Sequence, residues 1–254
     1  MILKRFATAV CILILVTPLL AQDRAEKIEQ IRKLLAAREY QQAESLAREV
    51  LNAAPGDAEA RGVLGWSLLG QNKFKEAETA AREGLHAAPE DVEANCVLGW
   101  SLLGQNRSKE AEQALLKAET AVPEIKPEDT NEPLRFRASA VHIGLARVYM
   151  EQKQLDKAAD AFSRAEKIQP KNPDLYYYRG MLDAHRKDYA AAARDMDKAI
   201  ELDPKRAEAY YYAGIAYNQI KKPDKMVERF QAFLKLAPDA PEAAKVKALL
   251  RSIR

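Results

Sequence analysis

The sequence has little cysteine, histidine and glycine, and this scarcity argues against several kinds of site. Its 254 residues include two cysteines, Cys11 and Cys96, three histidines in different parts of the chain, and ten glycines. No HExxH pair, CxxC pair or glycine-rich phosphate loop occurs. We therefore predict no catalytic residue, no cofactor and no metal site, and we expect a protein that is not an enzyme.

The chain also lacks an excess of charge of one sign. Charged residues make up 30% of it, yet the formal net charge is only +3, and it falls to +1 without Lys4 and Arg5. Acidic and basic residues alternate along the chain, which is typical of solvated helix surfaces and argues against a nucleic-acid partner. The abundant Ala, Leu, Glu, Lys and Arg favour helix.

What the sequence does contain is a repeat. The stretch VLGWSLLGQN at Val63–Asn72 returns letter for letter at Val97–Asn106, an offset of 34 residues. Prolines follow the same period, with one gap of 47 residues, at Pro55, Pro89, Pro123, Pro170, Pro204 and Pro238. Alanines run in step at Ala43, Ala77, Ala111, Ala158 and Ala192. Self-similarity at this period predicts an array of helix–turn–helix units.

The repeats resemble the tetratricopeptide repeat (TPR) family from about Arg24 to Ala240. The resemblance is carried by the spaced alanines, the closing prolines and the pairs Leu64-Gly65, Leu98-Gly99, Arg179-Gly180 and Ala213-Gly214. It implies an all-α fold, a right-handed α-solenoid of about six helix pairs. It also implies a non-enzymatic scaffold for protein–protein interaction.

The repeat spacing predicts how the chain is divided. Repeats one to three occupy residues 24–123 and repeats four to six residues 134–240, and an acidic, proline-containing linker at residues 124–133 accounts for the longer gap. Residues 241–254 place Val246, Leu249, Leu250 and Ile253 on one helical face. We expect a capping helix there, because the last repeat would otherwise expose an apolar side.

Residues 1–21 have the pattern of a signal peptide. Lys4 and Arg5 precede the apolar run Phe6–Val16, Pro18 breaks that run, and Ala21 is a suitable last residue before cleavage. This predicts export, with a bacterial periplasm as the setting. The alternative is an uncleaved inner-membrane anchor, because Phe6 to Gln22 are 17 uncharged residues, at the lower limit for a spanning helix. The repeats would then belong to an envelope assembly or secretion complex.

The resemblance implies that the first helix of each repeat lines a concave groove. At about 100° per residue, Gly62, Trp66 and Leu69 share the stripe that faces it. The predicted partner-binding groove comprises Trp66, Leu69, Cys96, Trp100, Leu103, Ile143, Arg147, Met150, Tyr177, Met181, His185, Tyr211, Ile215 and Asn218. These residues are mostly apolar or aromatic, so we expect a protein or peptide partner with a hydrophobic segment. Homo-oligomerisation stays open.

Other interpretations of these residues remain. Trp66 and Trp100 could instead pack between adjacent repeats, and Cys96 could be a small buried residue. A hidden hydrolase or redox function would use Cys96 or His185. In the triplets at residues 176–178 and 210–212, we expect Tyr176 and Tyr210 to be core and the next tyrosine of each to face the groove.

Overall fold

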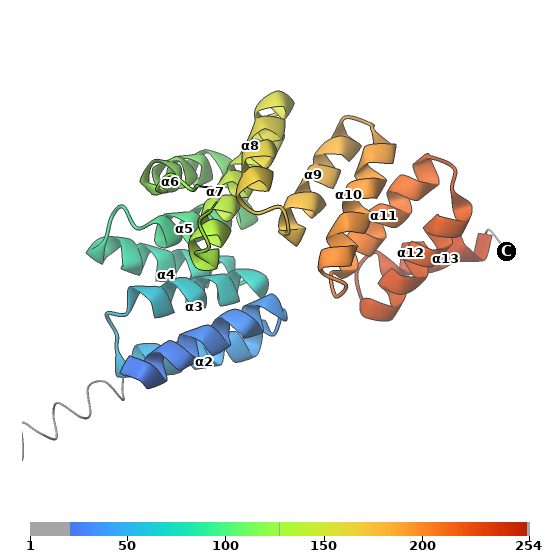
Figure 1. Cartoon of the computed structure of the whole chain (residues 1–254). Coiled ribbons are helices and arrows are strands. Elements are labelled where there is room, and N and C mark those ends of the chain that lie inside the picture. The colour runs from blue at the N-terminus through green and yellow to red at the C-terminus, as the bar shows by residue number, and fades with distance from the viewer. Residues whose placement is uncertain (1–20, 127, 253–254) are drawn as a thin grey trace, which may run out of the picture. The chain divides into compact units, whose positions relative to one another are not determined.

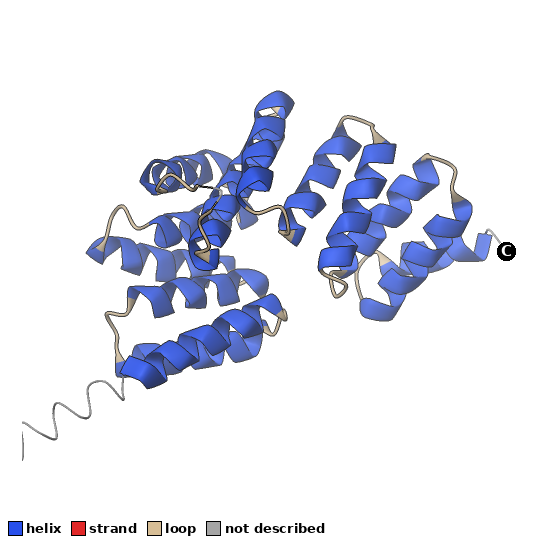
Figure 2. Cartoon of the chain, viewed as in Figure 1, coloured by secondary structure: helices blue, strands red, loops and turns tan. Residues whose placement is uncertain are grey.

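The computed structural model describes residues 21–126 and 128–252, and within these residues every regular element is a helix (Figures 1 and 2). Residues 21–36 are helical. The helices that follow are α2 (Tyr40–Ala53), α3 (Ala58–Gly70), α4 (Phe74–Ala87), α5 (Val92–Gly104), α6 (Ser108–Ala121), α7 (Glu132–Glu151), α8 (Leu155–Ile168), α9 (Pro173–His185), α10 (Tyr189–Leu202), α11 (Ala207–Gln219), α12 (Pro223–Leu236) and α13 (Ala243–Ser252). The expected all-α array of helix pairs is confirmed.

The chain divides into two compact units, Met1–Ala114 and Leu115–Arg254, and the boundary falls within α6. In the N-terminal unit α3 packs against α2, α4 and α5, and Figure 1 shows α2 to α5 stacked in the order of the sequence. In the C-terminal unit each helix from α7 to α12 packs against the next, and α9 also contacts α7 and α11. Residues 122–126 and 128–131, which contain most of the predicted linker, are not helical.

A left-handed residue marks the turn within each helix pair. Among the residues that the structure describes, the residues other than glycine with positive φ are Arg38, Asn72, Asn106, Lys153, Lys187 and Lys221, with φ between 57° and 63°. Their spacing is the 34-residue period with the same single gap of 47. A left-handed residue after the last helical turn lets its neighbours hydrogen-bond the free carbonyls, as Lys73 N does to Leu68 O at 2.9 Å. The 34-residue period is therefore present in the backbone conformation as well as in the side chains.

Side-chain caps begin several of the first helices. The Asp57 carboxylate accepts a hydrogen bond from Ala60 N at 3.0 Å, and its counterpart Asp91 accepts one from Ala94 N at 2.7 Å. Asn131 caps α7 in the same manner, through Leu134 N at 3.1 Å. These bonds satisfy N–H groups that have no partner inside the helix, and they fix where each helix starts.

Glycines in the first helices allow close packing of neighbouring helices. A Cβ on Gly65 would lie 2.6 Å from Val97 Cγ1 of the next first helix, and a Cβ on Gly104 would lie 2.3 Å from the Phe74 ring of the preceding helix. Glycine is thus a steric requirement at both positions.

A charged network recurs between consecutive repeats of the N-terminal unit. Glu44 Oε2 accepts hydrogen bonds from Gln71 Nε2 at 2.7 Å and Lys73 Nζ at 2.8 Å. Burial opposes ionisation of Glu44, but these bonds and one from Arg48 outweigh it and lower its pKa to about 2. The same contacts recur 34 residues later among Glu78, Gln105 and Arg107.

The C-terminal helix α13 covers the last repeat. Ala243 and Val246 are buried against α12 residues that include Phe230 and Phe233, and Leu249 and Leu250 are packed beside them. This arrangement is the expected capping helix, except that Ile253 lies outside the described residues. The predicted signal peptide lies almost wholly outside them too. In residues 21–126 and 128–252, no helix combines the length and hydropathy needed to cross a membrane.

Candidate partner-binding surfaces

The first helices of the N-terminal unit present an aromatic surface. Trp66 of α3 and Trp100 of α5 occupy the same position in successive repeats, and their rings meet edge-to-face with centroids 6.4 Å apart. Both indoles are half-buried, as is Leu69 one turn further along α3. We call Trp66, Leu69, Glu93 and Trp100 the tryptophan surface.

Glu93 fixes the geometry of this surface. Its carboxylate accepts a hydrogen bond from Trp66 Nε1 at 3.1 Å. The Glu93 side chain lies over Gly62, and a Cβ added to Gly62 would be 2.5 Å from Glu93 Cδ. Gly62 therefore leaves the space in which the carboxylate can reach the indole, and this bond orients Trp66.

One repeat earlier the same positions are charged. Arg32 stands where Trp66 and Trp100 stand in the following repeats, and it forms an ion pair with Glu59, the counterpart of Glu93. Arg24 also binds Glu59 and, more closely, Asp57. The hydrogen bond from Arg24 lowers the pKa of Asp57 even though burial opposes this. The surface thus changes from ionic in the first repeat to aromatic in the second and third.

In the C-terminal unit the equivalent helices carry a tyrosine cluster. The Tyr177 ring lies 4.9 Å from Tyr178 and 6.0 Å from Tyr212, and Tyr212 lies 5.2 Å from Tyr211. Two guanidinium groups stack on this cluster, Arg147 over Tyr178 at 4.6 Å and Arg206 over Tyr177 at 4.7 Å. Burial raises the pKa of Tyr177 and of Tyr178, so both phenols stay protonated at neutral pH. The cluster is a neutral aromatic patch, and Arg206 at its edge is ion-paired with Asp174 and Asp203.

The structure places the predicted groove residues in three groups. Half-buried are Trp66, Leu69, Trp100, Arg147, Met150, Tyr177, Met181, Tyr211 and Ile215. His185 and Asn218 are exposed. Cys96, Leu103 and Ile143 are buried, at 0%, 2% and 0% exposure. The prediction that these three residues are exposed in the groove is therefore wrong.

Neighbouring helices explain the correction. Helix α5 packs against both α3 and α4, and α7 packs against both α8 and α9. These contacts cover part of the helix face that was predicted to be open, and Cys96 and Ile143 fall within the covered part. With its side chain fully buried, Cys96 matches the interpretation as a small packing residue and offers no thiol to a partner.

The tyrosine triplets only partly follow the prediction. Tyr176 is buried, as expected, and its hydroxyl donates to Pro170 O at 2.8 Å. Tyr210 is only half-buried, although its hydroxyl makes the equivalent contact with Pro204 O at 3.3 Å. Tyr211 lies against Phe230 and Phe233 of the terminal core rather than standing clear of it.

Several residues of these surfaces were missed by sequence reasoning. They are Glu93, Tyr178, Arg206 and Tyr212. The available signal was the repeat register: Glu93 and Glu59 are 34 residues apart, as are Tyr178 and Tyr212. Their partners stand about a full repeat away in sequence, so single-helix periodicity could not reveal the contacts.

Metal chemistry finds no support in the described part of the chain. Within it, no group of three or more His, Cys, Asp or Glu side chains is placed to hold a metal ion. His185 is exposed, while Cys96 is buried on a different helix in the other unit.

Comparison with protein families matches three models described as tetratricopeptide repeat, over residues 63–124, 145–211 and 208–240. The matched residues take in both tryptophans and both tyrosine triplets. Comparison with curated proteins gives no match.

Solved structures share the fold at low sequence identity. PilF of Pseudomonas aeruginosa is 20% identical, with a TM-score of 0.58 over 90% of this chain and 98% of its own. PilW, a type IV pilus biogenesis factor, is 17% identical, with a TM-score of 0.60 over 89% and 98%. Human IFIT1, in a dimer with PPP-AAAA, is 18% identical, with a TM-score of 0.68 over 85% and 50%. These likenesses concern the fold alone, whereas the helix-pair array, its register and the three family matches together show that the chain belongs to the tetratricopeptide repeat family.

Proposed function

We propose that the chain is a non-enzymatic scaffold that holds a hydrophobic segment of a partner protein against its first helices. The observation that carries this proposal is the pair of half-buried indoles, Trp66 and Trp100, in edge-to-face contact 6.4 Å apart. Tryptophans in such positions dominate binding energies, each contributing about 2 kcal/mol or more when central. Repeats of this family serve protein interaction, so the proposal adds a location and a partner chemistry.

The tryptophan surface favours a segment with a large apolar anchor. The two rings and Leu69 supply the apolar area that such an anchor would contact. An extended or helical peptide with a large apolar side chain meets this requirement.

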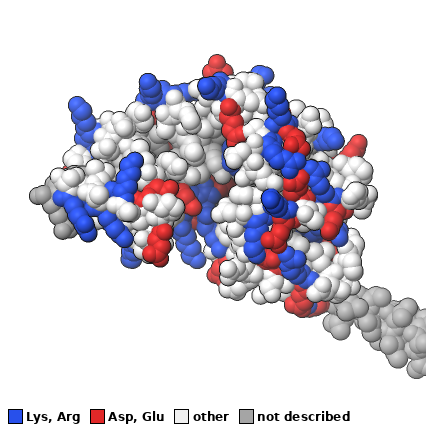
Figure 3. All heavy atoms as spheres, turned by 180° about the vertical axis from the view of Figure 1, so that it is seen from behind, with Lys and Arg blue, Asp and Glu red and all other residues white. Residues whose placement is uncertain are grey.

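Nucleic acid is the weaker candidate. Basic and acidic side chains are interspersed over the face shown in Figure 3, and neither sign forms a continuous band there. Phosphate backbones are bound through sustained positive charge, which a net charge of +3 spread in this way does not supply. IFIT1, solved as a dimer with PPP-AAAA, has a similar fold, so the side chains and not the fold decide between the two partner classes.

Location follows from the N-terminal pattern. We infer that residues 1–21 direct the repeats out of the cytoplasm, with a bacterial periplasm as their setting. The second candidate keeps these residues as an inner-membrane anchor and places the chain in an envelope assembly complex, which the resemblance in fold to PilF and PilW makes worth testing. Sequencing the N-terminus of the mature protein separates the two, since Gln22 as first residue removes the anchor.

The partner-binding proposal is tested by selecting displayed peptides on the full chain and measuring their affinity for variants. Trp66→Ala with Trp100→Ala should weaken selected peptides at least about tenfold while the far-ultraviolet circular dichroism stays the same. The matched control is Leu116→Ala with Leu236→Ala, which removes apolar side chains that are 38% and 43% exposed elsewhere. Equal affinity of the selected peptides for the tryptophan variant and the control variant would contradict the proposal.

A further inference from the structure

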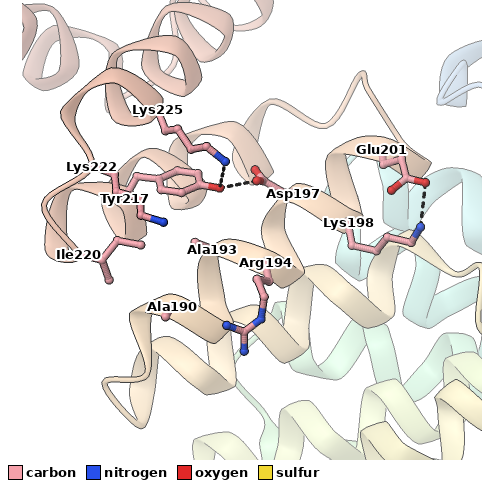
Figure 4. Close-up of a pocket in the computed structure, with 10 residues that line it drawn as sticks. All are labelled: Ala190, Ala193, Arg194, Asp197, Lys198, Glu201, Tyr217, Ile220, Lys222 and Lys225. Carbon is pink, nitrogen blue, oxygen red and sulfur yellow. Dashed lines mark hydrogen bonds and ion pairs between the residues drawn. The ribbon is translucent and has the colours of Figure 1, made fainter.

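The C-terminal unit contains a pocket that is separate from both aromatic surfaces. It has a volume of about 420 Å³ and lies between α10, the end of α11 and the start of α12 (Figure 4). Its floor is apolar, with Ala193 and Tyr217 at 2% and 4% exposure. Ile220 lines one side and is half-buried. This volume falls in the range of small-ligand sites.

The acidic groups of this pocket already have partners. The Tyr217 hydroxyl donates to Asp197, and Arg229 Nε donates to the other oxygen of the same carboxylate at 2.9 Å. Glu201 is paired with Lys198 at 2.8 Å. Burial and the contact with Asp197 raise the pKa of Tyr217 to about 12, so its hydroxyl keeps its proton at neutral pH. Neither carboxylate is left to neutralise the rest of the lining.

Three basic side chains remain. Lys225 Nζ donates a hydrogen bond to the Tyr217 hydroxyl at 3.4 Å and lies 5.1 Å from the centre of the Tyr217 ring, and Figure 4 shows that hydroxyl between Lys225 and Asp197. For the side chains of Arg194 and Lys222, the described residues supply no hydrogen bond or ion pair, although both line the pocket. The lining thus carries four basic side chains (Arg194, Lys198, Lys222 and Lys225) against the two carboxylates of Asp197 and Glu201, so the pocket has a net positive charge around an apolar floor.

We propose that this pocket binds an oxyanion, a carboxylate or a phosphate group, carried on a side chain of a peptide ligand. A guanidinium presents a planar pair of donors that fits either group, and two ammonium groups complete a charged rim. The apolar floor of Ala193 and Ile220 accommodates the short stem that carries the anion. The pocket consists of residues outside the tryptophan surface, so an experiment that contradicts one of the two proposals leaves the other unaffected.

Three peptides of one sequence test the proposal on the full chain, with glutamate, phosphoserine or glutamine at the central position. The acidic peptide, the phosphorylated peptide or both should bind, and the glutamine peptide should not; the preference identifies the source of the anion. Adding acetate or inorganic phosphate, whichever matches the preferred peptide, should shift the NMR signal of the Arg194 side-chain Nε–H. Failure of both charged peptides to bind more tightly than the glutamine peptide would overturn the assignment.

Matched variants separate a site from a general charge effect. Arg194→Ala with Lys222→Ala should weaken the bound peptide about tenfold or more. Lys245→Ala with Arg251→Ala removes the same two charges from exposed positions outside the pocket and should change affinity less than about twofold. An equal loss in both double variants would contradict a built site, and so would an Arg194 signal that neither acetate nor inorganic phosphate moves.

Discussion

At two equivalent positions of the first helices, the order of the large and the small side chain is reversed between the N-terminal and C-terminal units. In the N-terminal unit a small residue precedes a tryptophan by four positions, as in Gly62 and Trp66 and in Cys96 and Trp100. In the C-terminal unit a tyrosine comes first and an aliphatic residue follows, as in Tyr177 and Met181 and in Tyr211 and Ile215. Residues four apart share a helix face, so the same face carries one indole in the N-terminal unit and a phenol beside an aliphatic side chain in the C-terminal unit.

The units also differ in how they satisfy charge. Carboxylates with lowered pKa, such as Glu44 and Asp57, belong to the N-terminal unit, where bases from adjacent repeats hold them. In the C-terminal unit burial and the nearby Asp195 raise the pKa of Asp183 to about 6. Asp183 occupies the repeat position of Leu68 and Leu102, both 1% exposed. The N-terminal unit therefore repeats one carboxylate network from repeat to repeat, whereas the C-terminal unit contains a partly buried carboxyl whose pKa is raised, and the predictions below test that contrast.

The largest effect is expected at the repeat glycine. Gly65→Ala should lower the free energy of unfolding by about 1–3 kcal/mol, because the new Cβ would meet the stiff Val97 side chain at 2.6 Å. Gly180→Ala should be near neutral, since its nearest neighbour is the flexible end of Met196 at 3.1 Å and alanine favours helix. Urea unfolding measures both, and equal losses would refute a difference in packing between the units.

The second effect concerns the duplicated glutamate network. Glu44→Gln should lower the free energy of unfolding at pH 7 by about 1 kcal/mol, because it removes a charged acceptor shared by Gln71 and Lys73. A folded-state pKa of about 2 gives stability that is present above the unfolded value near 4.5 and is lost as the pH falls toward 2. The difference between wild type and variant should thus shrink in acid; a pH-independent difference would count against the network.

The third effect lies in the turns. Lys187→Gly should raise the free energy of unfolding by about 1 kcal/mol, since lysine at φ 63° carries a left-handed strain that glycine lacks. Asn72→Gly should gain less, because asparagine tolerates this conformation better. Thermal unfolding of the two variants gives the comparison, and a larger gain at Asn72 would reverse it.

The smallest effect is the titration of Asp183. A raised folded-state pKa means that its contribution to stability is present below the unfolded value near 3.8 and is lost as the pH rises through about 6. Asp183→Asn should therefore stabilise the chain at pH 7 more than at pH 4. Urea unfolding at both pH values measures this, and His142, whose pKa burial lowers, cancels because both proteins carry it. An equal gain at both pH values would contradict the burial of this carboxyl.

The fold could be predicted well from the sequence because the same local sequence pattern recurs in several repeats. The identity of Val63–Asn72 with Val97–Asn106 fixed the helix pairs and their turns. The candidate partner-binding surfaces were harder to predict from the sequence. Burial of Cys96 depends on what a neighbouring helix places beside it, and the bond from Trp66 to Glu93 joins two repeats.

The basic pocket was not predicted for the same reason. Arg194 lies on α10, Lys222 in the turn before α12 and Tyr217 on α11, so three segments contribute to it. Helical periodicity places residues on the face of one helix, whereas a pocket between helices depends on how several faces meet.

The central claim is that a partner covers the tryptophan surface. Trp66 and Trp100 are the only tryptophans in the chain, so quenching of intrinsic fluorescence by acrylamide reports on this surface directly. A peptide selected on the full chain should reduce quenching at saturation, with the Leu116→Ala and Leu236→Ala control behaving as wild type. Unchanged quenching with the peptide bound would contradict the account.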